Sequence, residues 1–174
     1  MNRLRADMRR KREIFSADSG AKMSRLRLWM TDGTSANILY RGMRWAAANG
    51  LAPIAYLLQY ANKLLNGCVI GIHAEFGPGF VLMHPVGVII NSKVRGGTNV
   101  TLESGVVIGD NKGCSPVLGC EIFIGAGAKV FGGITIGSGV NIGANAVVCK
   151  SVAEGVLMLG VPARPHRSDG PEIK

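Results

Sequence analysis

The sequence lacks the features that would assign the chain to a membrane, to secretion or to a metal. It contains no run of about 18 apolar residues, so we expect no transmembrane span. No apolar core follows its basic first residues, so we expect no secretory signal peptide and a cytoplasmic location. The four cysteines form no CxxC pair, and only three histidines accompany them. The sequence therefore predicts no metal site.

Acidic and aromatic residues are also few. The chain has 11 Asp and Glu against 20 Lys and Arg, and its net charge is +9. Nine of the cations lie in residues 1–27, where aromatic side chains do not alternate with them. That arrangement argues against nucleic acid, which single-strand binders hold with interleaved aromatics. Contact of residues 1–27 with an anionic membrane face stays open, as does a solvated helix face.

Glycine is abundant, and it accompanies a repeat with a period of six residues. Apolar residues recur at that interval over 31 residues: Leu118, Ile124, Val130, Ile136, Ile142 and Val148. A second small or apolar column lies two residues ahead: Ile122, Ala128, Ile134, Val140 and Ala146. A helix has a period of 3.6 and an ordinary strand a period of 2, so neither fits. The pattern is typical of a parallel β-helix.

The repeat begins near Cys68, and it is interrupted twice. Its inward column starts Ile70, Phe76, Leu82, continues Ile90, Gly96, Leu102, Ile108, and then reaches Leu118. Two extra residues enter around His84–Gly87, and four more enter around Asp110–Pro116. Irregular segments on a rigid scaffold are where sites are usually built, so His84 is a candidate site residue. The two interruptions could face one cleft, across a boundary between subunits.

Start and stop signals predict a helical segment ahead of the repeat. We expect helices over residues 2–15, 26–30 and 35–48, and a further one from Pro53 to about Leu65. Ser16–Gly20 reads as a break, and Asp32–Ser35 as a turn with helix-capping residues. The predicted organisation is a helical region over 1–67, a β-helix domain over 68–164 and a tail over 165–174.

Several motifs resemble those of the left-handed β-helix acyltransferases, and within them the serine O-acetyltransferase family. The resemblance spans about residues 5–167. Its motifs are Leu39-Tyr40-Arg41 with Trp45, Phe76-Gly77-Pro78-Gly79, His84 to Ile90, Ile124-Gly125-Ala126-Gly127-Ala128-Lys129-Val130 and Gly160-Val161-Pro162-Ala163-Arg164. The family transfers acetyl groups from acetyl-CoA to a hydroxyl, in homotrimers or dimers of trimers with sites between subunits. The resemblance therefore implies a left-handed parallel β-helix and this activity.

The resemblance also implies roles for individual residues. His84 matches the catalytic histidine, and a base that titrates near neutral pH suits the activation of a hydroxyl. Asp18 falls on an aspartate that orients the histidine and recognises serine. The residues that match the acetyl-CoA site are Ala126 and Ala144 along the pantetheine arm, Cys149 and Lys150 near the CoA phosphates, and Arg164 and Arg167 near the adenosine phosphate. For Lys150 and Arg164, ordinary solvated charge is the alternative.

Two departures from the family pattern concern the acceptor. Met83 stands where serine enzymes have an aspartate, and Cys114-Ser115-Pro116 stands where they have Arg-His-Pro. A site without charged groups should hold an amino acid zwitterion poorly. These losses favour a sugar or polysaccharide precursor over L-serine in cysteine biosynthesis, which is the alternative. A non-catalytic β-helix scaffold is a second alternative.

Overall fold

The computed structural model describes residues 3–20 and 24–166, and within these ranges helices precede a series of very short strands. The helices are α1 (Arg3–Ser19), α2 (Arg25–Met30), α3 (Thr34–Ala48) and α4 (Ala52–Asn66). α1 is longer than expected because nothing in Ser16–Ser19 breaks a helix. It ends at Gly20, whose φ of +65° lies in the left-handed region. α4 ends at Gly67 in the same way, as predicted.

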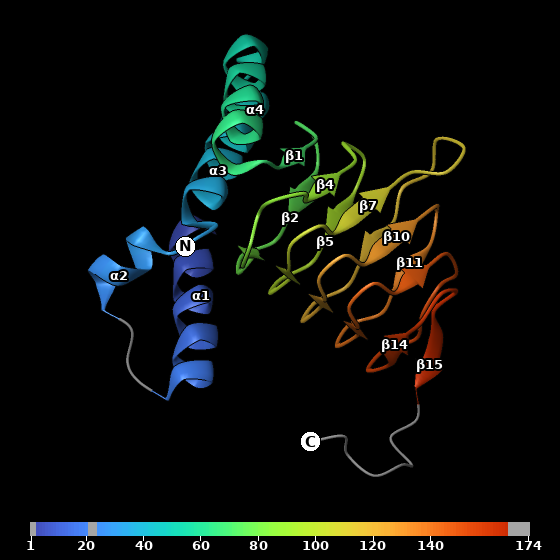
Figure 1. Cartoon of the computed structure of the whole chain (residues 1–174). Coiled ribbons are helices and arrows are strands. Elements are labelled where there is room, and N and C mark those ends of the chain that lie inside the picture. The colour runs from blue at the N-terminus through green and yellow to red at the C-terminus, as the bar shows by residue number, and fades with distance from the viewer. Residues whose placement is uncertain (1–2, 21–23, 167–174) are drawn as a thin grey trace.

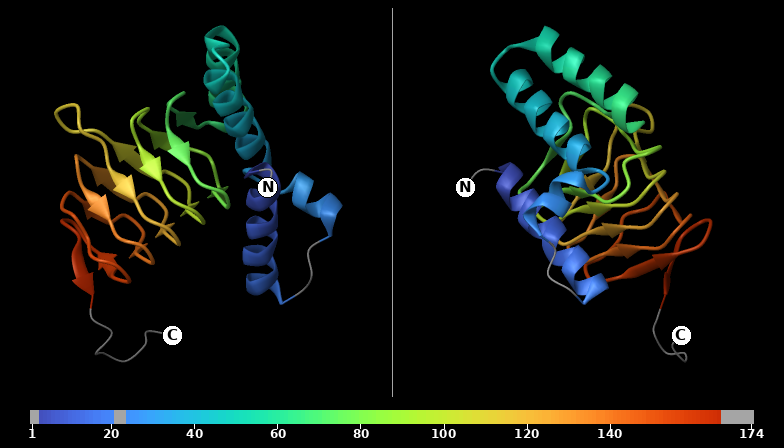
Figure 2. Two further views of the ribbon diagram at one scale, coloured as in Figure 1. Left: turned by 180° about the vertical axis from the view of Figure 1, so that it is seen from behind. Right: turned by 60° about the vertical axis from the view of Figure 1, so that its left-hand side comes forward.

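The strands form three parallel sheets that wind around one axis (Figures 1 and 2). Face A holds β1 (Val69–Ile70), β4 (Ile89–Ile90), β7 (Val107–Gly109), β10 (Lys129–Phe131) and β13 (Val147–Val148). Face B holds β2 (Glu75–Phe76), β5 (Arg95–Gly96), β8 (Val117–Leu118) and β11 (Thr135–Ile136). Face C holds β3 (Val81–Leu82), β6 (Thr101–Leu102), β9 (Phe123–Ile124), β12 (Asn141–Ile142), β14 (Leu157–Leu159) and an antiparallel β15 (Arg164–His166). The predicted fold class, a parallel β-helix with a helical segment before it, is confirmed.

The register of the strands agrees with the period of six. On face A, Ile70 pairs with Ile90, Ile90 with Ile108, and Ile108 with Val130. The two long coils run from Ile70 to Ile90 and from Ile108 to Val130, and they contain the two predicted interruptions. The extra residues leave the coil at its corners, so like residues still stack on one another and the core stays continuous.

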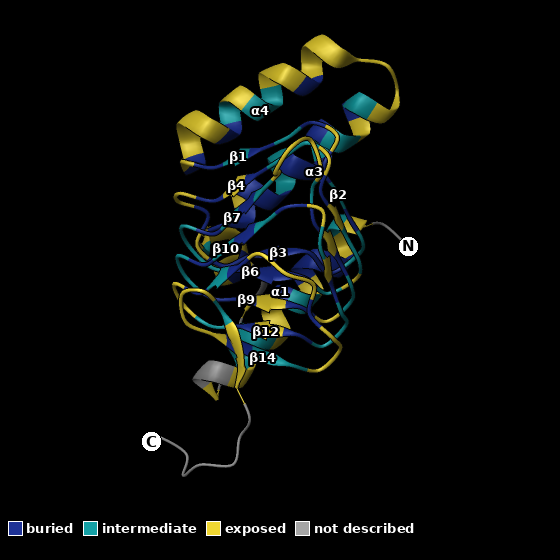
Figure 3. Ribbon diagram, turned by 90° about the vertical axis from the view of Figure 1, so that its right-hand side faces the viewer, coloured by how far each residue is buried: buried dark blue, intermediate teal, exposed yellow. Residues whose placement is uncertain are grey.

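The predicted inward columns form the core, and their residues are buried (Figure 3). Gly96 is the one column position without a side chain, and the sequence alone suggests a loosely packed coil there. The structure shows otherwise. A Cβ on Gly96 would lie 2.3 Å from the Phe76 ring, which fills the space and stacks on Phe80 with centroids 4.1 Å apart.

Two buried side chains of α3 attach the helices to the first coil. Tyr40 is fully buried, and its hydroxyl donates to the Ala74 carbonyl and accepts from the Phe76 N–H. Arg41 donates from Nε to the Asp7 carboxylate of α1 at 2.7 Å and also reaches the Phe76 and Gly77 carbonyls. The Tyr40-Arg41 motif therefore joins α1, α3 and the β-helix through buried hydrogen bonds.

α1 lies beside face C, and α4 lies across the first coil (Figures 1 and 2). In β3 and β6 the residues that point outward, Val81 and Thr101, are buried as well as those that point inward. This double burial follows from the cover that α1 provides. None of the helices in the described ranges is long and apolar enough to cross a membrane.

Candidate active site

His84 lies in the first interruption of the repeat, at the edge where face C turns into face A. It lies two residues after the end of β3, and its side chain is 55% exposed. The turn around it is tied to its neighbours, because the Gly87 N–H donates to the Gly67 carbonyl and the Gly105 N–H donates to the Val86 carbonyl, both at 2.9 Å. The extra residues thus form a fixed loop that presents an imidazole at the surface.

Asp32 is the partner of this histidine, although the sequence predicts for it only a position in a turn. His84 Nδ1 lies 3.0 Å from Asp32 Oδ2, and the Asp32 side chain is 56% exposed. The other carboxylate oxygen, Oδ1, accepts from the Gly33 N–H at 3.0 Å. A carboxylate only accepts hydrogen bonds, so this contact assigns the ring proton to Nδ1 and leaves Nε2 as the basic nitrogen.

Gly33 allows this contact to form. Its φ is +77°, and a Cβ built on it would lie 2.1 Å from the carbonyl oxygen of Leu82. Only glycine can therefore bring the start of α3 so close to the end of β3. Because Asp32 precedes Gly33 and His84 follows Leu82 by two residues, the close approach of the two backbones places both side chains together.

Lys11 of α1 forms hydrogen bonds with both of these segments, the start of α3 and the end of β3. Its side chain is fully buried, and Nζ donates to the carbonyl oxygens of Asp32 and Leu82 and to Thr34 Oγ1. Burial lowers the pKa of Lys11 to about 8, and the nearby Asp32 charge partly opposes that shift. An ammonium group that joins both backbones stabilises the position from which Asp32 meets His84.

Asp18 lies in the last turn of α1, and its side chain falls outside the described part of the structure. Its predicted role at the histidine therefore stays a prediction.

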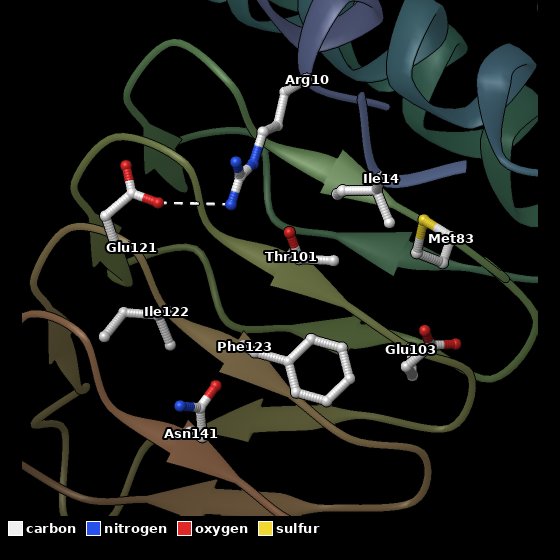
Figure 4. Close-up of a pocket in the computed structure, with 9 residues that line it drawn as sticks. All are labelled: Arg10, Ile14, Met83, Thr101, Glu103, Glu121, Ile122, Phe123 and Asn141. Carbon is white, nitrogen blue, oxygen red and sulfur yellow. Dashed lines mark hydrogen bonds and ion pairs between the residues drawn. The ribbon is translucent and has the colours of Figure 1, made fainter. Parts of the chain in front are cut away.

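A cleft of about 340 Å³ opens between α1 and face C beside the histidine loop (Figure 4). Arg10 of α1 reaches across it to Glu121, with 3.3 Å between NH2 and Oε2. Met83, the residue before His84, lies at one end. The other lining residues are Ile14, Thr101, Glu103, Ile122, Phe123 and Asn141. The charged groups in this cleft are therefore the Glu103 carboxylate on the side of Met83 and the Arg10–Glu121 pair on the opposite side.

The predicted pantetheine residues lie on the same edge of the β-helix as His84. Ala126 and Ala144 occupy the turns from face C to face A in later coils. Hydrogen bonds run along this edge from turn to turn: the Gly127 N–H donates to the Ser104 carbonyl at 2.7 Å, and the Asn145 N–H donates to the Ala126 carbonyl at 2.8 Å. Coils about 4.8 Å apart place the turn of Ala144 about 14 Å from that of His84.

Three of the predicted CoA residues line one pocket at the end of the β-helix. Cys149, Lys150 and Arg164 are exposed and surround a volume of about 450 Å³ with an apolar floor that includes Val152 and Met158. The structure thus brings the two residues after β13 next to Arg164 of β15, and their role in binding CoA stays a prediction. Arg167 lies outside the described residues, so its placement stays a prediction.

The second interruption lies at a different edge, between face A and face B. It forms a tight hairpin in which Asn111 and Cys114 pair and Lys112 and Gly113 have positive φ. Within a single chain, therefore, Cys114 and His84 do not share a cleft. In the described ranges no three His, Cys, Asp or Glu side chains form a group that could hold a metal ion.

Comparison with known proteins gives consistent results at the level of sequence and fold, although no family model matches the chain. A serine acetyltransferase of Mycobacterium tuberculosis is 32% identical over 165 residues, which cover 92% of this chain and 71% of that protein. A serine acetyltransferase of Synechococcus elongatus is 33% identical over 157 residues, which cover 88% of this chain. The aligned residues make up 64% of that second protein, so the chain spans less than two thirds of its length.

Solved structures resemble the chain over almost its whole length. The Neisseria gonorrhoeae serine acetyltransferase in complex with serine has a TM-score of 0.84 and is 30% identical, covering 93% of this chain and 67% of its own. A serine acetyltransferase in complex with CoA has a TM-score of 0.86 and is 27% identical, covering 95% of this chain and 68% of its own. Both similarities include the helices as well as the β-helix.

Proposed function

The chain belongs to the serine acetyltransferase family, and on that premise we propose that it transfers the acetyl group of acetyl-CoA to the hydroxyl group of L-serine. The observation that carries this proposal is the pair of His84 and Asp32, 3.0 Å apart on an exposed edge of the β-helix. A histidine so oriented has the geometry of a general base. A scaffold without catalysis would have no use for it.

In the proposed reaction, His84 Nε2 takes the proton of the acceptor hydroxyl as its oxygen attacks the thioester carbonyl carbon. The carbon–sulfur bond then breaks, and the imidazolium returns the proton to the leaving thiolate of CoA. Asp32 stabilises the imidazolium and keeps the ring in one orientation. The products are an O-acetyl ester and free CoA, and no metal takes part in these steps.

Acetyl-CoA would lie along the edge that carries Ala126 and Ala144, with its phosphates near Lys150 and Arg164. Fixed cations beside phosphates form strong charge-assisted hydrogen bonds. The CoA complex of a relative with a TM-score of 0.86 supports a site of this kind. Cys149 lines the same pocket, and Arg167 would extend it.

L-serine is the acceptor that the comparisons favour. The relatives bear its name, and one similar structure holds serine. None of these relatives supports the sugar or polysaccharide precursor that the residue differences predict. Those differences, at Met83 and Cys114-Ser115, are the specific reason to keep a sugar as the second candidate.

We also propose a cytoplasmic homotrimer with its sites between subunits. The two interruptions of the repeat lie at different edges of one chain. Association around a threefold axis would allow the His84 edge of one copy to meet the 110–116 hairpin of the next. Such a trimer would complete a site that a single chain leaves open on one side.

The test is CoA release from acetyl-CoA with L-serine as one acceptor and a panel of sugars and nucleotide sugars as the other. We expect turnover with L-serine, and a loss of about 100-fold or more in the His84→Ala variant. Turnover with a sugar but not with L-serine would show that the acceptor is a sugar, while the proposed transfer of acetyl to a hydroxyl would stand. Absence of turnover with every acceptor, together with no binding of acetyl-CoA, would contradict the proposed function.

A further inference from the structure

We propose that α1 and α2 form a docking surface for an anionic phospholipid membrane, with Trp29 inserted among the lipids. The surface consists of Arg5, Arg9, Arg12, Leu26, Arg27, Trp29 and Met30, and we call it the α1–α2 surface. The proposal does not depend on the identity of the acceptor, since none of these residues lies in the candidate active site.

The apolar part of the surface comes from α2. Leu28 is buried against Met8 of α1 and holds the short helix in place. The other large apolar residues of α2 point away from the protein: Leu26 is 73% exposed, Trp29 57% and Met30 80%. α2 also stands apart from the β-helix in two views (Figures 1 and 2). Exposed Trp beside aliphatic residues is typical of helices that lie in the membrane interface.

The cationic part comes from α1, which borders the same surface. A groove of about 860 Å³ runs between the two helices, with Leu4, Met8, Leu28 and Trp29 on its walls and Arg5, Arg9, Arg12 and Glu13 at its rim. Arg27 of α2 is exposed nearby. Of these cations, only Arg9 has an ion pair among the described residues, to Glu13 at 3.7 Å. An apolar groove with a basic rim fits the acyl chain and phosphate of an anionic lipid.

The outer face of α4 is a second exposed apolar surface, and its charge separates it from the first. Leu57, Tyr60 and Leu64 are all more than half exposed there, which the yellow ribbon of α4 shows in Figure 3. Lys63 is the one charged residue of that helix. Anionic lipid attracts basic clusters, at about 1 kcal/mol per Lys or Arg. The lipid surface is therefore assigned to α1 and α2 and not to α4.

The chain allows a direct test because it contains only two tryptophans, Trp29 on the α1–α2 surface and Trp45 on α3. The Trp45→Phe variant leaves Trp29 as the fluorescent reporter, and the Trp29→Phe variant leaves Trp45, which is 62% exposed, as its matched control. With vesicles of phosphatidylcholine and phosphatidylserine at low salt, we expect the Trp29 emission to shift to shorter wavelength and to become shielded from an aqueous quencher. The Trp45 emission should not change.

Charge reversal tests the basic rim by vesicle co-sedimentation. We expect Arg5→Glu with Arg12→Glu to weaken binding by at least about 30-fold. The control, Lys63→Glu with Lys112→Glu, changes the net charge equally at distant exposed sites and should bind as the parent chain does. Circular dichroism confirms that each variant is folded.

Three outcomes would overturn the proposal: no binding to anionic vesicles at low salt, equal binding to vesicles of phosphatidylcholine alone, or a shift of Trp45 in place of Trp29. Since none of these measurements uses acetyl-CoA, their failure is distinguishable from failure of the proposed enzymatic function.

Discussion

At the scale of single residues, the central feature is a contact between side chains 52 positions apart. Asp32 reaches His84 because Gly33 lets the start of α3 approach the end of β3, and Lys11 holds both backbones. The family resemblance points to His84 and to Asp18, but not to Asp32. In this chain the carboxylate that contacts the imidazole is that of Asp32, which lies in the turn between α2 and α3.

Replacement of Asp32 by Asn tests that role. An amide can donate to Nδ1, which would move the ring proton to Nε2 and remove the base. We expect kcat to fall at least about 10-fold, with an unchanged KM for acetyl-CoA and an unchanged melting temperature, because the pair is half exposed. Steady-state kinetics measure kcat and the KM for acetyl-CoA separately, and thermal unfolding measures the melting temperature.

Two further variants complete the comparison. Asp32→Glu should recover part of the lost kcat, and Glu154→Gln, at an exposed carboxylate far from His84, should behave as the parent enzyme. A fall in melting temperature with a proportional loss of both kcat and acetyl-CoA binding would instead mean that Asp32 is merely structural.

Lys11 makes the stability of the fold depend on pH. Its pKa is about 8 in the folded chain against 10.5 for an ordinary lysine, so the unfolded chain binds this proton more tightly between those two pH values. The free energy of unfolding should therefore rise with pH from about 8 to 10.5, by about 3 kcal/mol from this group. Urea unfolding of the parent chain and of Lys11→Met at several pH values measures the difference.

The matched control is Lys63→Met, at an exposed lysine on α4. The free energy of unfolding of this variant, plotted against pH, should stay parallel to that of the parent chain between about pH 8 and 10.5. If the curve of Lys11→Met stays parallel too, the buried lysine does not carry this pH dependence.

At the scale of elements, α1 is attached by one buried carboxylate. Asp7 accepts from Arg41 Nε at 2.7 Å and Arg41 NH2 at 2.9 Å, and from the N–H groups of Gly79 and Phe80 at 2.9 and 3.0 Å. Both charged residues are buried, so removal of either one would leave the other as an unpaired charge in the interior. This arrangement positions α1 against β3 and so also positions Lys11 below the histidine loop.

The Asp7→Asn change should therefore destabilise the protein strongly. It leaves the buried guanidinium of Arg41 without an opposite charge, which costs about 3–5 kcal/mol in comparable cases. Glu13→Gln on the same helix breaks only the exposed pair with Arg9 and should change stability by less than about 1 kcal/mol. If the two variants unfold at the same urea concentration, Asp7 does not anchor α1.

At the scale of the whole molecule, the candidate site residues of a single chain are spread over separate parts of the β-helix. His84 and the pocket of Lys150 and Arg164 lie at different places along the β-helix, and the 110–116 hairpin lies at another edge. If sites form between copies, one copy can supply the histidine while its neighbour supplies the pocket for CoA.

Mixed oligomers test this proposal. His84→Ala and Arg164→Glu should each be nearly inactive alone, yet co-expression should recover activity, because some sites then combine an intact histidine with an intact pocket. Sedimentation equilibrium should give three copies of the 18.3 kDa chain. Recovery no greater than the sum of the two single variants would place the whole site within one chain.

The β-helix, the positions of its two interruptions and the approximate bounds of the helices could all be predicted from the amino-acid sequence. These features can be read from local spacing: residues six apart take equivalent positions in successive strands, and Gly67 ends a helix by its own backbone conformation. The inward columns could therefore be read residue by residue. His84 and the residues that match the acetyl-CoA site followed from motifs, and their roles stay predictions.

Which distant residues come into contact could not be predicted in this way, because it depends on the packing of the elements. The pairs of Asp32 with His84 and of Asp7 with Arg41 join segments 52 and 34 residues apart. No periodic spacing links such segments, because their contact depends on how α1 and α3 pack on the first coil. The same packing leaves Trp29 outside while Leu28 is buried, a choice that α2 alone, with apolar residues on several sides, does not specify. Local patterns therefore specify the elements, and long-range packing specifies the site.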